Sequence, residues 1–284
     1  MLNKKARGMI QISRPELPLA AGICVVLGEV VALGRFPSLR ETVLGFLCGF
    51  FISGSAIVWN DYFDLEVDRV NTPERPLPSG LISPAEAILL AAITALIGLT
   101  ASFFISISAF VLCVIFWIIG FLYNWKFKEA GLAGNLMVSG SVGITFILGG
   151  MAAGAPGSKI VWCFAMMAFF IDLGEEIAGD AMDMEGDQER GSKSIALVQG
   201  RGFALALSSI FFALAVSISL LPALLGWMGR IYLLLILVTD VLIVGFTVRL
   251  LRSKTPREGR ASMRGIYLGA TVGVLAAILG QVLR

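Results

Sequence analysis

The chain has 284 residues, of which 57% are hydrophobic and 15% are charged, and its formal net charge is +2. A mean hydropathy of +0.87 excludes a soluble globular domain, and the near-neutral charge gives no reason to expect a nucleic-acid partner. The chain contains no histidine, which excludes imidazole general bases, Ser–His nucleophile pairs and His-ligated zinc.

Apolar stretches follow one another along the whole chain. Each is near the ~20 residues that a helix needs to cross a bilayer. They cover residues 17–34, 43–63, 84–105, 107–125, 133–153, 159–179, 202–222, 230–251 and 264–282. We therefore expect an all-α, polytopic membrane bundle of about nine helices around a central cavity, formed by a single domain over residues 1–284.

Basic residues are distributed unevenly between the two sides of this bundle. If the N-terminus and every second loop lie on one side, that side holds most of the 22 Lys and Arg residues. The positive-inside rule then predicts a cytoplasmic N-terminus, and an odd number of spans places the C-terminus outside. The expected location is the cell membrane, as a multi-pass protein.

Two acidic motifs share the spacing D-x-x-D-x-x-x-D, and each stands at the end of an apolar stretch. They comprise Asp61, Asp64 and Asp68, preceded by Asn60, and Asp180, Asp183 and Asp187. On a continuous helix, positions i, i+3 and i+7 share one face, so we expect each motif to direct three carboxylates the same way. The repeated spacing also suggests an internal duplication of a four-helix unit.

Further acids precede the second motif. Asp172 and Glu176 continue its stripe along stretch 159–179, whereas Glu175 lies off it. A stripe of carboxylates cannot face lipid, so we expect Asp172 and Glu176 to line a polar cavity. Glu29 and Asp240 lie deep in other stretches, where each would either line the cavity or form a helix–helix hydrogen bond.

The acidic motifs require compensating cations, because clustered carboxylates repel one another. Carboxylate and amide oxygens are hard ligands that suit Mg²⁺, or Mn²⁺ as a second possibility. A carboxylate-bound Mg²⁺ binds a diphosphate, and basic side chains neutralise the remaining charge. The candidates for diphosphate contact are Arg75, Lys126, Lys128, Arg190 and Lys193. The basic run from Arg249 to Arg264 is interpreted as a solvated loop near anionic lipid headgroups.

The two motifs together resemble the signature of the UbiA family of membrane prenyltransferases. The first reads Asn60-Asp61-x-x-Asp64-x-x-x-Asp68 with Arg75 seven residues on. The resemblance implies Mg²⁺-dependent transfer of a polyprenyl group from its diphosphate to a lipophilic acceptor, at a cytoplasmic-side active site. It implies metal binding by Asn60 and by the aspartates of both motifs, although Asp61 could instead bond a neighbouring helix or a basic side chain.

This interpretation gives the candidate residues two roles, catalysis and lining of the cavity. Asp64, Asp68, Asp183 and Asp187 are the expected catalytic residues. Tyr62 and Tyr123 are expected to line the cavity beside Asp172 and Glu176, facing the allylic carbocation that forms when the diphosphate leaves.

Several further segments resemble the archaeal branch of this family that acts in ether-lipid synthesis. They are Tyr123–Lys128, Gly134-Asn135, Phe146–Gly150 and Glu185-Gly186-Asp187. That resemblance implies a geranylgeranyl donor and geranylgeranylglyceryl phosphate as acceptor. The chain departs from the branch in the stretch Gly174-Glu175-Glu176-Ile177, which has an acid where a basic residue is expected, and at Gly179, where a lysine is common.

Three alternatives compete with this interpretation, one within the same family and two from other classes of protein. Relatives within the family that act on an aromatic quinone precursor or on chlorophyllide share much of the pattern. An ion-coupled secondary transporter would explain the intramembrane acids but not two repeated motifs followed by basic loops. A CDP-alcohol phosphotransferase is disfavoured because its D-G-x-x-A-R signature is missing.

Overall fold

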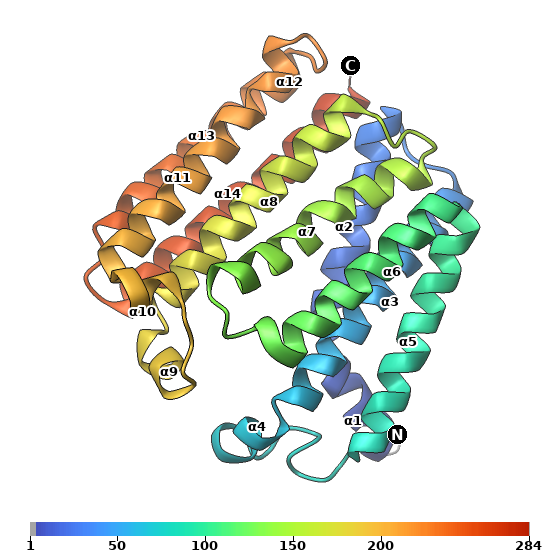
Figure 1. The fold of residues 1–284 in the computed structure, drawn as a ribbon. Coiled ribbons are helices and arrows are strands. Elements are labelled where there is room, and N and C mark those ends of the chain that lie inside the picture. The colour runs from blue at the N-terminus through green and yellow to red at the C-terminus, as the bar shows by residue number, and fades with distance from the viewer. Residues whose placement is uncertain (1–3, 284) are drawn as a thin grey trace. The chain divides into compact units, whose positions relative to one another are not determined.

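The computed structural model describes residues 4–283, and this part of the chain contains helices but no strands (Figure 1). The helices are α1 (Lys4–Ser13), α2 (Glu16–Leu33), α3 (Leu39–Phe63), α4 (Leu65–Asn71), α5 (Pro84–Ile105), α6 (Ile107–Leu122), the π-helix η1 (Tyr123–Phe127), α7 (Leu132–Ala152), α8 (Lys159–Asp180), α9 (Met184–Glu189), α10 (Ile195–Gln199), α11 (Arg201–Ser219), α12 (Leu221–Leu224), α13 (Arg230–Leu251) and α14 (Pro256–Val282). The predicted all-α, polytopic class is confirmed.

The long helices correspond to the predicted apolar stretches. Eight helices in the described chain are long and apolar enough to cross a membrane: α2, α3, α5, α6 continued by η1, α7, α11 continued by α12, α13 and α14. The remaining predicted stretch, 159–179, corresponds to α8. This helix is long enough to cross a membrane, but it carries Asp172, Glu175 and Glu176 in its C-terminal half. The number of spanning helices is therefore approximately nine.

Helix α14 begins earlier than the sequence predicted. The expected stretch started at residue 264, but the helix starts at Pro256, where proline suits the first helical position and the Thr255 side chain accepts a hydrogen bond from the Glu258 N–H. The expectation that Arg257 and Arg260 lie in a solvated loop is thus wrong, because both are in the first turns of α14.

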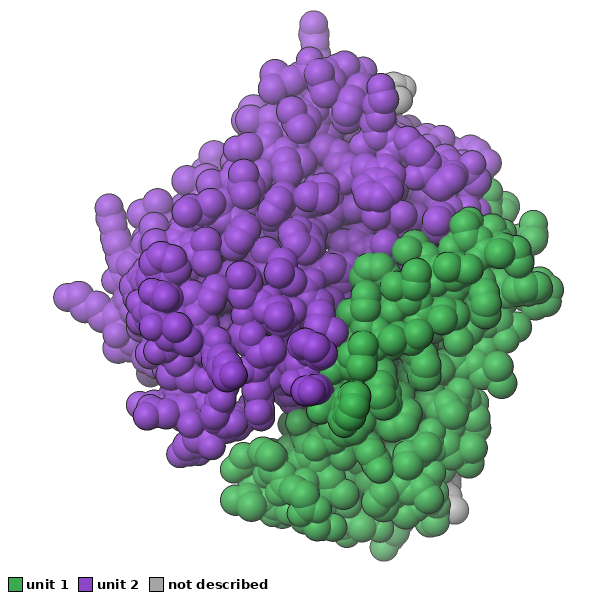
Figure 2. Space-filling view, in the orientation of Figure 1, with its two compact units in different colours: residues 1–26, 37–125 green, residues 27–36, 126–284 purple. Residues whose placement is uncertain are grey.

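The described chain divides into two compact units (Figure 2). The first contains the residues up to Val26 and Pro37–Trp125, and it carries the first acidic motif. The second contains Leu27–Phe36 and the chain from Lys126 onward, and it carries the second motif. The single-domain assignment and the internal duplication stay predictions.

In the first unit, α3 packs along α5 and also contacts α1 and α6. The Ser55 hydroxyl donates to the Ala91 carbonyl at 2.8 Å and accepts from Trp117 Nε1 at 3.0 Å, which joins three helices through one buried group. Leu77 and Ile82, from the loop after the first motif, are buried against Val58 of α3. This packing anchors the basic loop that carries Arg75.

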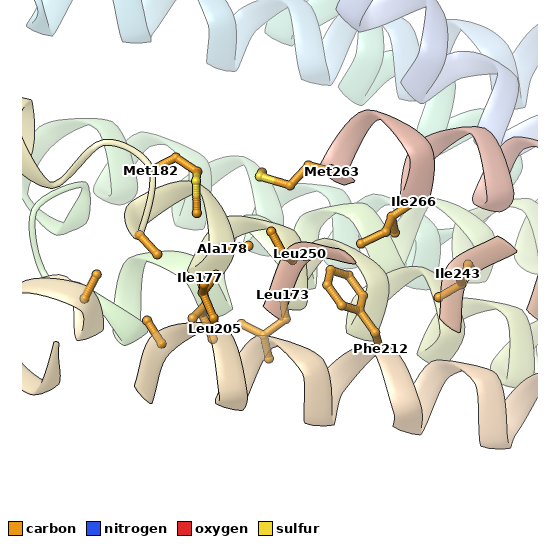
Figure 3. Close-up of a cluster of buried hydrophobic side chains, with 13 residues drawn as sticks. Leu173, Ile177, Ala178, Met182, Leu205, Phe212, Ile243, Leu250, Met263 and Ile266 are labelled. Carbon is orange, nitrogen blue, oxygen red and sulfur yellow. The ribbon is translucent and has the colours of Figure 1, made fainter. Parts of the chain in front are cut away.

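In the second unit, α8 packs against α7 and α11, and α13 packs along α14. Leu173 and Ile177 of α8 meet Phe212 of α11 and Ile266 of α14 in a buried cluster (Figure 3). Polar groups join the same helices: the Ser208 hydroxyl donates to the Gly174 carbonyl at 2.5 Å. Since lipid is as apolar as these side chains, close packing and interhelical hydrogen bonds hold the unit together.

The two isolated intramembrane acids differ in their surroundings. Asp240 of α13 accepts a hydrogen bond from the Ser219 hydroxyl of α11, with both carboxylate oxygens at 2.9 Å, so it serves as a helix–helix link. Tyr232 donates to the Ser219 carbonyl at 2.6 Å and strengthens the same junction. Glu29 of α2 is fully buried. The four cysteines are free thiols, and three of them are buried.

We predict that Gly28→Ala lowers the thermal unfolding midpoint in detergent. A Cβ on Gly28 would lie 2.5 Å from the Phe146 carbonyl oxygen and 3.0 Å from its Cα, and these backbone atoms can yield only if α2 and α7 separate, at roughly 1–3 kcal/mol for overpacking. The matched control is Gly245→Ala on α13, where no atom lies within 4 Å of the added Cβ. Equal unfolding midpoints for the two variants would contradict the prediction.

Candidate active site

The first acidic motif lies at a break between two helices. Asp61 is in the last turn of α3, Asp68 is in α4, and Asp64 is the single residue between the helices, with φ −83° and ψ 0°. The expectation of one continuous helix is therefore wrong at Asp64. The hydrogen bond from the Asp68 N–H to the Asp64 carbonyl, at 2.8 Å, nevertheless continues the helical direction across the break.

Two arginines compensate the buried carboxylates of this motif. Arg14, between α1 and α2, forms an ion pair with Asp61. Arg75 Nη1 lies 2.6 Å from Asp68 Oδ2 and 3.9 Å from Asp61 Oδ1. Burial lowers the pKa of Arg75, but its hydrogen bond to Asp68 and the nearby aspartate charges outweigh this effect and raise it above its ordinary value. Asp61 and Asp68 thus share one cation, as side chains on one face would.

An asparagine from η1 orients Asn60. The Asn124 amide nitrogen donates to the carbonyls of Ala56 and Gly120, at 3.1 and 2.9 Å. Its oxygen must therefore be the acceptor toward Asn60 Nδ2, at 3.0 Å. This directs the Asn60 carbonyl oxygen, the atom that can bind a metal, away from Asn124. The local π-helix is an irregularity often found at functional sites.

The second motif also lies at a helix break. Asp180 is the last residue of α8, Asp183 precedes α9, and Asp187 lies within α9. The single-helix expectation is wrong for this motif too. Asn135 of α7 donates to Asp180 Oδ2 at 3.0 Å, so an asparagine orients the first ligand candidate of each motif. Asp183 forms an ion pair with Arg260 of α14.

Asp187 retains unused capacity to bind a cation. Its Oδ2 is buried and has no hydrogen-bond partner among the described residues. Burial raises the pKa of Asp187 above its ordinary value, as does the charge of Asp183, while neighbouring Ser194 and Arg190 act in the opposite direction. A bound divalent cation would satisfy this oxygen.

The basic segment before α7 and the basic segment after α9 are joined by a backbone hydrogen bond. The Lys193 N–H donates to the Glu129 carbonyl at 2.9 Å. Gly131 makes the approach possible: its φ is +61°, and an added Cβ would collide with the Lys193 carbonyl oxygen. Lys128 and Lys193 are therefore carried on connected segments, while Lys126 and Arg190 are exposed beside them.

The acids of α8 lie in its C-terminal half, and the cavity-lining role of Asp172 and Glu176 stays a prediction. Asp172 and Glu176 are half-buried, and Asp172 Oδ2 is a second buried oxygen with no partner in the described chain. Glu175, off the stripe, faces α14, where the Tyr267 hydroxyl lies against its carboxyl group.

Aromatic side chains surround the first motif. Tyr62 is half-buried and packs edge-to-face against Trp59 and Phe63, with ring centroids 5.6 and 5.3 Å away. Tyr123 is the first residue of η1. Their cavity-lining role stays a prediction.

The donor atoms fit Mg²⁺ without enclosing it. In residues 4–283 no three acidic or cysteine side chains gather closely enough to hold a metal ion by themselves. Mg²⁺ uses one or two carboxylates and completes its shell with water and phosphate oxygens, so a dedicated cage is not required. The oriented carbonyl of Asn60 in the first unit and the unpartnered oxygen of Asp187 in the second are each suitable as a single Mg²⁺ ligand at their own motif.

The comparison with known families decides the identity of this arrangement. Residues 21–278 match the model of the UbiA prenyltransferase family. The chain belongs to this family. It is a membrane-embedded prenyltransferase whose acidic motifs occupy the junctions α3–α4 and α8–α9.

Similar proteins extend over the full chain. Digeranylgeranylglyceryl phosphate synthase from Thermococcus kodakarensis is 32% identical over 278 residues, covering 98% of this chain and 99% of that protein. The synthase from Methanopyrus kandleri is 33% identical, covering 95% and 97%. A solved digeranylgeranylglyceryl phosphate synthase structure has a TM-score of 0.87 at 30% identity, covering 99% of this chain and 100% of that one.

A more distant structure has the same fold. A UbiA homologue from Archaeoglobus fulgidus bound to GPP and Mg²⁺ is 21% identical, with a TM-score of 0.66 over 95% of this chain and 99% of that one.

Sequence reasoning missed four side chains of this UbiA prenyltransferase: Asn124, Asn135, Arg14 and Arg260. The two asparagines lie in segments that resemble the archaeal branch, which was the available signal. Arg14 precedes the first apolar stretch, where a basic residue is common at the membrane interface and so does not indicate a site. Arg260 gave no signal, since its partner Asp183 is distant in the sequence.

We predict that Asn124→Ala weakens the apparent affinity for Mg²⁺ in the prenyl-transfer reaction by roughly 10–100-fold, the usual loss when a group that orients a ligand is removed. Ser55→Ala is the matched control, because it breaks another polar link between the same helices without touching Asn60. The measurement is initial rate against Mg²⁺ concentration, with unfolding midpoints for both variants. An unchanged Mg²⁺ dependence of Asn124→Ala would contradict the orienting role.

Proposed function

We propose that this prenyltransferase transfers a geranylgeranyl group from its diphosphate to the free hydroxyl of geranylgeranylglyceryl phosphate, in a Mg²⁺-dependent reaction. The observation that carries the proposal is the paired construction of the motifs: a metal-ligand candidate oriented by an asparagine, next to carboxylates compensated by arginine. The names of the full-length relatives support the acceptor, and the GPP- and Mg²⁺-bound homologue supports the donor and the metal.

The residues divide the work as follows. Asn60, Asp64 and Asp68, with Asp61 next to them, hold Mg²⁺ at the first motif, and Asp180, Asp183 and Asp187 do so at the second. Bound Mg²⁺ supplies charge stabilisation for the departing diphosphate. The list of side chains proposed to contact the diphosphate is Arg75, Lys126, Lys128, Arg190 and Lys193.

Bond changes in the transfer balance without any further reagent. The allylic C–O bond to diphosphate breaks and leaves a carbocation, the acceptor hydroxyl oxygen forms the new C–O bond, and its proton is released. Tyr62 and Tyr123 offer ring faces to the cation, while Asp172 and Glu176 keep polar groups along the cavity wall. A water-poor cavity protects the cation from hydrolysis.

We also propose a cytoplasmic N-terminus, an external C-terminus and location in the cell membrane. The asymmetry of Lys and Arg residues between the loops supports this orientation. Both acidic motifs would then open to the cytoplasm, where prenyl diphosphates and Mg²⁺ are supplied.

We predict that Asp64→Asn and Asp183→Asn each reduce prenyl transfer about 100-fold or more, because several kcal/mol of charge stabilisation depend on the metal. The assay follows labelled geranylgeranyl diphosphate with purified protein and Mg²⁺. Glu66→Gln and Glu185→Gln are the matched controls, since both acids are exposed neighbours within the motifs and outside the triplets. Full activity in a chelator, or in both aspartate variants, would overturn the mechanism.

We predict that geranylgeranylglyceryl phosphate is the preferred acceptor in a panel with an aromatic quinone precursor and chlorophyllide. The readout is kcat/KM for each acceptor at fixed donor concentration. Faster transfer to an aromatic acceptor would reject the ether-lipid assignment while retaining the prenyltransferase chemistry.

A further inference from the structure

The N-terminal end of α14 carries three arginines at the same spacing as the acidic motifs. Arg257, Arg260 and Arg264 occupy positions i, i+3 and i+7, so at about 100° per residue they lie within roughly 60° of one another around the helix. All three are exposed. Because they are in a helix and not in a loop, they form a fixed basic row.

Packing places this row beside the second acidic motif. Gly259 lies against Met182, where a Cβ would collide with the Met182 sulfur, and a Cβ on Gly179 would lie 3.9 Å from Met263 Cε. Figure 3 shows Met182 and Met263 at the same end of the buried cluster. Further along, Tyr267 lies against Glu175. Positions further along α14 therefore lie opposite positions progressively earlier in α8 and in the segment that follows it. The two helices run antiparallel.

Two arginines on this surface differ in their partners. Arg260 forms an ion pair with Asp183, and its Nη2 lies 3.4 Å from the Met182 carbonyl oxygen. Arg264, one turn further along α14, forms no ion pair among the described residues. It lies between the level of Asp183 and that of Glu175. Its exposed guanidinium is open to water or to an anion.

Gly179 opens the space opposite these arginines. It carries no side chain, and an added Cβ would meet only Met263. The positive charge near the end of α8 thus comes from α14 and not from α8 itself.

We propose that Arg260 and Arg264 bind the phosphate monoester of the acceptor lipid. The inference rests on the proposed function and extends it with the part of the site that recognises the acceptor. A phosphate monoester carries close to two negative charges at neutral pH, which two guanidinium groups match, and arginine binds phosphate oxygens through two parallel N–H donors.

The acceptor phosphate is favoured over the donor diphosphate because of the position of Arg264. The carboxylates of the second motif, with Arg190 and Lys193, already serve the donor. Arg264 lies on a different helix, along the face that leads from Asp183 toward Glu175 and Tyr267. In this structure Arg260 pairs with Asp183, and it would be free to bind the acceptor phosphate if a cation were bound to that carboxylate instead.

The test compares Arg264→Gln and Arg260→Gln with wild type, using the full chain in phosphatidylcholine nanodiscs with Mg²⁺. The expected result is a KM for geranylgeranylglyceryl phosphate raised roughly 10-fold or more in both variants, from the loss of a charge-assisted contact, with an unchanged KM for the donor in Arg264→Gln, because Arg264 does not pair with Asp183. With geranylgeranylglycerol, which lacks the phosphate, Arg264→Gln should match wild type. Arg252→Gln, at the end of α13, is the matched control.

Three results would overturn the proposal. In Arg264→Gln, a KM for the donor raised as much as the KM for the acceptor assigns the arginine to the diphosphate. A loss that persists with geranylgeranylglycerol makes the role structural. A defect in Arg264→Gln that appears only when phosphatidylglycerol is added to the nanodiscs assigns the arginine to bilayer headgroups.

Direct binding separates this proposal from the proposed function. Without donor, wild-type protein should bind geranylgeranylglyceryl phosphate more tightly than geranylgeranylglycerol, measured by intrinsic tryptophan fluorescence, and Arg264→Gln should remove most of that difference. If no transfer occurs but the difference in binding persists, the reaction assignment fails and the phosphate site stands. If transfer occurs and Arg264→Gln binds both lipids as wild type does, the phosphate site fails alone.

Discussion

The constraint on which the rest of the site depends is the compensation of carboxylates at the ends of membrane helices. Asp61 and Asp68 share Arg75, Asp61 also pairs with Arg14, and Asp183 pairs with Arg260. Asp61 and Asp68 are buried, and unpaired carboxylates in such positions would be costly to desolvate. Arginines therefore hold the motifs in place when no metal is bound. A guanidinium group can also bind the oxygens of a phosphate.

Two features of the helices make this compensation possible. Each motif lies at a helix break, so its carboxylates are carried by two helices and the residues between them, and not by one continuous helix. Glycines such as Gly131 and Gly259 then allow neighbouring segments to approach closely enough for their charged groups to meet. Because lipid provides no hydrophobic force between helices, such close contacts and hydrogen bonds carry the architecture as well as the site.

The amino-acid sequence predicted much of the fold and of the candidate site. Hydropathy predicted the positions of the long helices, and the repeated D-x-x-D-x-x-x-D spacing predicted both motifs and their family. The prediction failed where local geometry depends on neighbours: Asp64 interrupts a helix that periodicity alone would continue, and Pro256 starts α14 before its apolar stretch begins. Hydropathy averages over a whole span and does not register a single junction residue or a polar first turn.

By itself, the sequence determined the class of protein, the hard oxygen chemistry and the two places where that chemistry resides, because these follow from composition and from spacing along one chain. Only the tertiary structure decided which groups orient and neutralise the motifs. Asn124 reaches Asn60, Asn135 reaches Asp180 and Arg260 reaches Asp183 across long separations in sequence. Such pairings depend on how helices pack, and no local pattern specifies which asparagine or arginine will meet which side chain of the motifs.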